Sequence, residues 1–188
     1  IAQPTSIVTI RSSDIVDCVL GIFTPPNSVL YAPALNITQT KIGLQASSLK
    51  PDYVLQPAHG SLPKAGIEVN NVIMTLGGSS SGLNEFFKLN TGIVANNSKL
   101  TVRRSKFYNI TYDPFYTEPY RGNSIVVVRT PNSDFAGSRL DVLPEPFAFN
   151  TIENCYKGIY TFGAAFQVNN IHLLNVHTGV RAEKRLMR

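Results

Sequence analysis

The chain has 188 residues, of which 43% are hydrophobic and only 15% are charged, and its formal net charge is +5. So much apolar surface excludes wholesale disorder, and no apolar run approaches the ~18 residues of a membrane-spanning helix. Basic residues gather in the last eight positions, where Arg181, Lys184, Arg185 and Arg188 outweigh Glu183 by three charges. Nucleic-acid-binding proteins carry their basic residues as a face or stripe, so we expect no nucleic-acid partner and no membrane span.

Short segments in which apolar residues alternate with other residues recur along the whole chain. In chain order they include 8–10, 67–69, 100–102 and 166–168, and Gly, Pro and Asn residues stand between them. Alternation with a period of two is typical of β-strands that bury one face, while Gly, Pro and Asn favour turns. The sequence therefore predicts an all-β protein with many turns.

A longer frame also repeats: an apolar residue, any residue, Asn, an apolar residue, two variable residues, Gly and a β-branched residue. It occurs at 15–22, 86–93, 152–159 and 173–180, with Asp and Lys in the place of Asn in the first two. The frame glycines are Gly21, Gly66, Gly92, Gly122, Gly158 and Gly179. Their spacing has a minimum of 21 residues and a variable excess, which is typical of a solenoid with loop insertions.

Three short strands in each repeat predict one triangular turn of a parallel coil, and neighbouring coils must stack to bury their inner faces. We expect the frame Gly to adopt positive φ at a corner and Asn to adopt the left-handed conformation. Cys18 and Cys155 both stand three residues before a frame Gly, a position that should point inward. We therefore expect two buried free thiols, four coils apart and too distant for a disulfide.

This pattern resembles the right-handed parallel β-helix of the pectin-lyase-like superfamily over about 8–182, without the motif of any particular enzyme family. The resemblance implies an Asn ladder in one inner corner, on which Asn109, Asn154 and Asn175 would lie. The chain is also similar to β-helical regions of secreted surface proteins of Bacteroidetes-type bacteria. We expect a single domain, 1–188, of about six coils, with an irregular insertion at 28–60 and further insertions at 77–85, 111–121 and 129–148.

The insertion at 111–121 carries the candidate ligand-binding residues. Aromatic faces meet the apolar side of a sugar ring, while carboxylates and a guanidinium group bind its hydroxyls. The alternative is that the rings cover the side of the coil as a local core, because so long a loop must bury something to stay ordered. The candidate residues are Tyr112, Asp113, Phe115, Tyr116, Glu118, Tyr120 and Arg121.

The repeat frame itself provides no catalytic constellation. Two residues after the frame Gly stand Phe23, Glu68, Val94, Tyr160 and Arg181, which form no acidic stack. A glycosidase needs paired carboxylates, and these could come only from insertions, as Asp113, Glu118 and Asp134. His172 and His177 lack the spacing of a helical metal pair, so we expect no metal and no cofactor, and the catalytic residues are unknown.

These observations favour a noncatalytic structural or adhesive β-solenoid segment of a secreted or cell-surface protein that contacts a polysaccharide or other glycan. One alternative is a polysaccharide lyase or glycoside hydrolase whose acids come from the insertions. Another is a phage or surface-fibre module. The last frame, at Gly179, is too short to complete a coil, so we expect further coils of the same protein, or another subunit, to cover this edge.

Overall fold

The computed structural model describes residues 7–16, 18, 20–24, 34–38, 40–43, 62, 64–77, 83–130, 138–145 and 148–184. The described residues form strands and turns, which confirms the all-β prediction, and they include no helix that could cross a membrane. The strands are β1 (Ile7–Arg11), β2 (Asp14–Val16), β3 (Leu20–Phe23), β4 (Ala34–Thr38), β5 (Lys41–Gly43), β6 (Ala65–Asn70), β7 (Ile73–Leu76), β8 (Asn84–Phe87), β9 (Ile93–Asn96), β10 (Lys99–Val102), β11 (Ser105–Tyr108), β12 (Asn123–Val128), β13 (Arg139–Val142), β14 (Asn150–Phe162), β15 (Ala165–Val168) and β16 (Ile171–Glu183).

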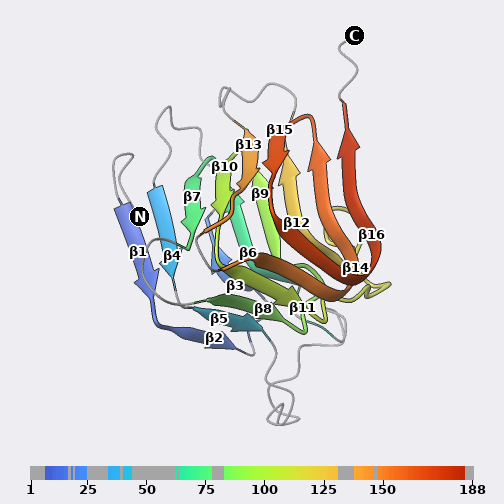
Figure 1. Ribbon diagram of the computed structural model, residues 1–188, viewed down its shortest axis with the longest axis horizontal. Helices are drawn as coiled ribbons and strands as arrows, with labels where there is room; N and C mark the ends of the chain where they lie inside the picture. The colour runs from blue at the N-terminus through green and yellow to red at the C-terminus, as the bar shows by residue number, and fades with distance from the viewer. Residues whose placement is uncertain are drawn as a thin grey trace.

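The strands form two parallel sheets that enclose the core (Figure 1). The smaller sheet has six strands in the order β1-β4-β7-β10-β13-β15. The larger has the order β2-β5-β8-β11-β14-β12-β9-β6-β3, and β16 pairs with β14. Each strand therefore lies beside the strand that follows it by one circuit of the chain. We call each circuit a rung: β1–β3 form rung 1, β4–β6 rung 2, β7–β9 rung 3, β10–β12 rung 4, β13 and β14 rung 5, and β15 and β16 rung 6.

The larger sheet bends at β14, a strand of 13 residues. Its first part pairs with β11 through residues 151–153, and its second part pairs with β12 through residues 157–162. In rungs 1 to 4 these two parts are separate strands, such as β11 and β12. The described rungs thus have three faces, one from the smaller sheet and two from the larger (Figure 1).

Apolar side chains of successive rungs lie in register and form columns inside the molecule. One column holds Ile67, Ile93, Ile125 and Ile159, all buried. In another, the rings of Phe86 and Phe107 stack with centroids 4.6 Å apart. Burying each such side chain contributes roughly 1.5–3 kcal/mol, so these columns stabilise the stack of rungs.

The frame glycines occupy one column in five rungs, and Ser124 occupies it in rung 4. The prediction for Gly122 is therefore wrong: this residue lies two positions earlier, with φ of 72°. The insertion at 111–121 rejoins the rung at Asn123, one residue after Gly122, so the frame position falls on Ser124 instead of Gly122. The predictions of a shared column are confirmed for Gly21, Gly66, Gly92, Gly158 and Gly179.

The prediction of positive φ is wrong for the five glycines of this column, and close packing between rungs explains why glycine stands there. A Cβ on Gly66 would lie 2.9 Å from the Gly92 carbonyl oxygen, and one on Gly158 would lie 2.3 Å from that of Gly179. Real Cβ atoms do not approach so closely, and neither glycine has positive φ. Positive φ falls instead on other residues, among them Lys88, Asn109, Asn154 and Asn175.

Asn109, Asn154 and Asn175 share one column, as predicted, but they do not fill an inner corner. The side chains of Asn154 and Asn175 are exposed, and Nδ2 of Asn175 donates to Oδ1 of Asn154 at 3.0 Å. The predicted inner position is therefore wrong for these two. A single left-handed residue turns the strand and directs its side chain to solvent, and Asn tolerates this conformation.

A buried polar column lies elsewhere, between the smaller sheet and the first face of the larger sheet. It holds Thr40, Asn84, Ser105 and Asn150, one from each of rungs 2 to 5. Thr40 N–H donates to Oδ1 of Asn84 at 3.1 Å, and Ser105 N–H donates to Oδ1 of Asn150 at 3.1 Å. These side chains satisfy backbone groups that a corner between strands would otherwise leave unpaired.

Two predicted insertions contain strands. β4 and β5 lie within 28–60 and β13 lies within 129–148, so the expectation of an irregular insertion at 28–60 is wrong for these residues. Among the side chains that the structure describes, β4 and β13 each bury two alternating apolar residues, such as Leu35 and Ile37 in β4. So short a pattern is a weak signal when long loops surround it.

The two cysteines differ. Cys155 is buried, as predicted, and its thiol donates to the Glu153 carbonyl oxygen 3.1 Å away. Burial raises the pKa of this thiol. Cys18 is exposed, so the prediction that it is buried is wrong, although both cysteines are free. Cys18 belongs to rung 1, whose described strands pair with rung 2 only.

Candidate functional site

The insertion at 111–121 covers the outer side of the second face of the larger sheet. There, Ala65, Val94 and Val126 form a second buried apolar cluster, and Tyr120 packs against it. Tyr116 is also buried, with 8% of its surface exposed, and its hydroxyl donates to the Leu62 carbonyl oxygen at 3.3 Å. This part of the insertion forms a local core, as one of the two interpretations predicted.

Asp113 organises the beginning of the insertion. It is buried, and its Oδ1 accepts a hydrogen bond from Phe115 N–H at 2.9 Å. Its own N–H donates to Oδ1 of Asn90 at 3.1 Å, and Nδ2 of Asn90 donates to the Tyr120 carbonyl oxygen at 2.7 Å. The backbone of Asp113 and the side chain of Asn90 thus tie the insertion to rung 3, while the buried Asp113 carboxylate holds the turn at Phe115.

Tyr120 is held as a neutral phenol. Lys64 Nζ lies 3.9 Å from its ring centroid and 3.2 Å from Oε2 of Glu68. Burial, and then a hydrogen bond to Glu68, raise the pKa of Tyr120 far above its ordinary value. The phenol therefore keeps its proton and serves as a packed hydrogen-bond donor.

Across rungs 4 to 6, aromatic rings lie in a row on the outside of the molecule, where Tyr112 is tilted by 31° to Tyr156 and His177 stacks on Tyr156. The Tyr112 and Tyr156 centroids lie 5.4 Å apart, and those of Tyr156 and His177 lie 5.2 Å apart. Arg121 contacts Tyr112, with Cζ 4.9 Å from the Tyr112 centroid and Nη2 donating to its hydroxyl at 2.8 Å. We call Arg121, Tyr112, Tyr156, His177 and the adjacent Lys157 the aromatic stripe.

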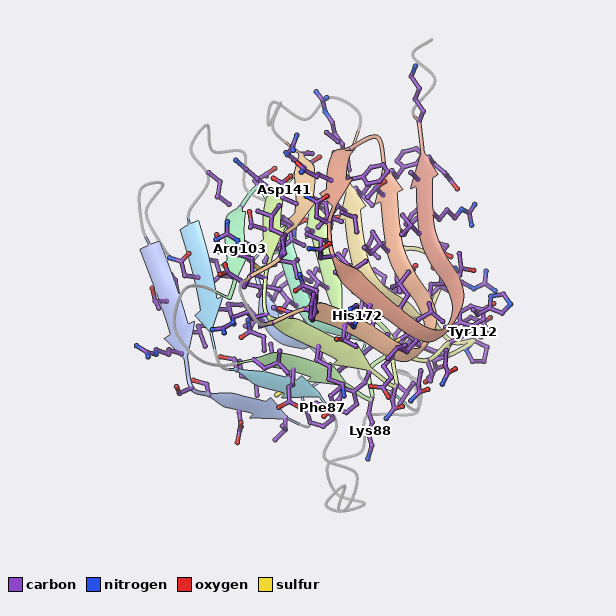
Figure 2. The ribbon with its side chains drawn as sticks, in the orientation of Figure 1. Phe87, Lys88, Arg103, Tyr112, Asp141 and His172 are labelled. Atoms are coloured by element: carbon purple, nitrogen blue, oxygen red, sulfur yellow. The ribbon has the colours of Figure 1, made fainter. Side chains whose placement is uncertain are left out.

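Rung register produces this stripe. Because Cys155 pairs with Val176, the residues that follow them, Tyr156 and His177, also lie side by side. Figure 2 shows Tyr112 at the periphery of the molecule, beside the bend of β14 and β16. Lys157 lies 5.6 Å from the Tyr156 centroid and forms an ion pair with Glu118.

The stripe offers cations, ring edges and one open aromatic face, and Phe115, outside the stripe, offers another. Its rings cover one another, so mainly their edges meet solvent, but the described residues leave the outer face of the exposed His177 without a stacking partner. Phe115 is 52% exposed and lies perpendicular to Tyr116, at 90°. Guanidinium and ammonium groups beside aromatic faces can bind the carboxylates, hydroxyls and C–H faces of sugars.

The seven predicted residues are therefore divided between two environments. Tyr112 and Arg121 belong to the stripe, and Glu118 adjoins it through Lys157. Asp113, Tyr116 and Tyr120 pack or bond inward, and Phe115 stands apart on the surface. Sequence reasoning missed Tyr156, Lys157 and His177 as members, although Tyr156 and His177 each stand two residues before a frame Gly, and this shared position is the signal that could have found them.

The acids named as possible catalysts do not meet in one place. Asp113 is buried in its turn, Glu118 pairs with Lys157, and Asp134 lies outside the described residues. Among the residues that the structure describes, no three His, Cys, Asp or Glu side chains gather as a metal site. No protein-family model, curated protein or solved structure matches the chain.

Proposed function

We propose that the chain is a segment of a right-handed parallel β-helix that acts as a noncatalytic, adhesive module of a secreted or cell-surface protein. Parallel pairing of every rung with the next supports the helical path. Crossovers between parallel strands of one sheet are right-handed in almost all proteins, which supports the hand. In this proposal the stacked rungs form a stiff support, and the ligand is a glycan.

The observation that carries the proposal is the aromatic stripe. Its three rings come from successive rungs and lie in a row, with centroids 5.4 and 5.2 Å apart. Such a row is fixed by the backbone, so little side-chain entropy is lost when a ligand binds. The open face of His177 receives the apolar side of a sugar ring, while the exposed Arg121 attracts its acidic groups. Lys157 is already paired with Glu118. An acidic polysaccharide fits this combination best.

Binding is tested with a glycan array that includes neutral and acidic polysaccharides, followed by affinity measurements on any glycan retained. Replacing a stacking or charged group of the stripe removes a contact worth roughly 0.5–1.5 kcal/mol. We therefore expect His177→Ala and Arg121→Gln each to weaken binding by about three- to tenfold, with an unchanged melting temperature.

His172→Ala is the matched control. His172 and His177 are both exposed residues of β16, and each stacks on an aromatic ring, Phe149 for His172 and Tyr156 for His177. Only His177 belongs to the stripe, so His172→Ala should bind as the unchanged chain does. Equal loss in both variants, or no retained glycan, would contradict the proposal. Depolymerisation of the bound polysaccharide would instead support the lyase or hydrolase alternative.

A further inference from the structure

Rung 6 has an unpaired outer edge. β15 pairs with β13, and β16, a strand of 13 residues, pairs with β14. In the part of the chain that the structure describes, no strand pairs with the opposite edges of β15 and β16. A long strand edge with free N–H and C=O groups is a template for a further strand.

The inward side chains of rung 6 are apolar and exposed. Phe166, Leu173 and Val180 expose 43%, 37% and 44% of their surface. Their register partners in rung 5, which are Leu140, Ile152 and Ile159, are buried. The inward side chains of rung 6 are therefore of the same apolar type as those of rungs that have another rung stacked on them.

Gly179 also leaves space for a further rung. A Cβ added to Gly21, Gly66 or Gly158 of this column would lie 2.3–2.9 Å from a carbonyl oxygen of the following rung. A Cβ on Gly179 would meet only Cδ1 of Leu173, at 3.1 Å, among the described residues. The column thus provides space at Gly179 for the carbonyl oxygen of one more rung.

Rung 1 offers the complementary surface. Its described strands pair on one side only, and Val8, in the column of Phe166, is 42% exposed. Because each frame Gly receives the carbonyl of the following rung, the Gly21 carbonyl is the group that would approach Gly179. Continuing the register also brings Asp14 beside His172, and Phe23 beside Arg181.

We propose that the occupant of the rung 6 edge is a second copy of this chain, stacked head to tail. β15 pairs in parallel with β1 of the next copy, and β16 pairs with its β2 and β3. The Asp14 carboxylate then meets the His172 imidazole, and the Phe23 ring meets the Arg181 guanidinium, an attractive arrangement for a cation. Such a contact does not close on itself, so it generates linear oligomers.

Sedimentation velocity of the full chain over a wide range of concentration tests the stacking. We expect mass to rise with concentration beyond that of a dimer. Gly179→Ala should weaken association by about tenfold or more, because its Cβ occupies the space for the incoming carbonyl. Its own fold should be unchanged, since Leu173 is a flexible neighbour. A chain that stays monomeric at every concentration would overturn the proposal.

Gly158→Ala is the matched control for the same clash inside one chain. Its Cβ would lie 2.3 Å from the Gly179 carbonyl oxygen, so this variant should lose folding stability, whereas Gly179→Ala should lose only association. Equal melting temperatures for Gly158→Ala and the unchanged chain would show that the column tolerates a Cβ. That result would remove the argument from Gly179.

Cross-linking tests the register independently. Val176 and Cys18 each stand three residues before a frame Gly, so the proposed stack brings them onto neighbouring strands, about 4.8 Å apart, within disulfide reach. Mild oxidation of Val176→Cys should give a ladder of disulfide-linked oligomers through the exposed Cys18. The double variant Val176→Cys/Cys18→Ser should give none. Dimers that persist in the double variant would indicate symmetric pairing of two β16 edges and overturn the head-to-tail arrangement.

Discussion

Asn150 and Asn154 lie four residues apart in β14 and serve different purposes. Asn150 is buried: its Nδ2 donates to the carbonyl oxygens of Leu143 at 2.9 Å and Val102 at 3.4 Å, and its Oδ1 accepts from Ser105 N–H at 3.1 Å. Asn154 is exposed, with φ of 52°. The first acts through its amide side chain, and the second through its tolerance of a left-handed backbone.

The difference teaches that one residue type supports the rungs in two ways, with unequal energies. A buried backbone group left without a partner costs about 1–3 kcal/mol. Asn150 is the partner of two such groups, the Leu143 carbonyl and the Ser105 N–H, while the Val102 carbonyl also accepts from Leu143 N–H. A non-glycine residue held in the left-handed region costs about 1–2 kcal/mol, and Asn reduces this cost because its side chain bonds locally. The inner column should therefore be far more sensitive to substitution than the outer one.

The largest effect is expected for Asn150→Ala. The variant leaves the Leu143 carbonyl and the Ser105 N–H without the partner that Asn150 provides, so the free energy of unfolding should fall by about 2 kcal/mol or more. Urea unfolding at neutral pH measures it. A loss no greater than that of a surface substitution would mean that the inner column does not hold the corner together.

A smaller effect is expected for Asn154→Ala. Alanine cannot bond locally in the left-handed region, so the free energy of unfolding should fall by about 1 kcal/mol, measured in the same urea titration. Asn154→Gly is the matched control, because Gly adopts positive φ without a steric cost; like Asn154→Ala it loses the bond from Asn175, so it should lose less stability than Asn154→Ala. The two columns would not differ if Asn154→Ala cost as much as Asn150→Ala.

The smallest effect concerns Cys155, which follows Asn154 and points inward again. Burial raises the pKa of its thiol above the ordinary 9.0, so the folded state favours the protonated form. Its contribution to stability is therefore fully present below about pH 9 and is lost as the pH rises through the folded-state pKa. Unfolding by urea at several pH values from 9 to 10 should show this loss, and Cys155→Ala should reduce the slope.

Three tyrosines provide an internal check on that window. Burial raises the pKa of Tyr108, Tyr116 and Tyr160 above the ordinary 10.0, so their own contribution to stability is fully present below about pH 10 and is lost above it. An unchanged slope in Cys155→Ala would assign the loss of stability to other groups and would remove the thiol as a reporter of the inner wall.

Much of the register was predictable from the sequence, because alternation and close packing leave local signals. Alternating apolar residues marked the inner columns, and five of six frame glycines lie where one rung approaches the next. Whether an Asn side chain points into the core or to solvent was not predictable, since the residue type alone does not distinguish Asn150 from Asn154. The count failed at Gly122 because the insertion rejoins the rung one residue later, at Asn123, and Ser124 takes the place of Gly in the column.

The candidate site was predictable in part for a similar reason. Tyr112 and Arg121 stand in one insertion, so their composition drew attention to them. Tyr156 and His177 join them only through contacts between rungs, and in the sequence alone both positions are typical of solvated turns. Asp113 and Tyr120 were drawn from the same insertion, but their burial depends on Asn90, Glu68 and the sheet beneath, which lie far away in the chain.

The insertion at 111–121 also has a consequence for how the molecule comes apart. A stack in which each rung contacts only its neighbours can lose rungs one at a time from an end. Here Tyr116 bonds to the Leu62 carbonyl before β6, Asp113 bonds to Asn90 of rung 3, and Glu118 pairs with Lys157 of rung 5. This strap joins rungs 2 to 5, so they should open as one cooperative unit, while rungs 1 and 6 fray independently.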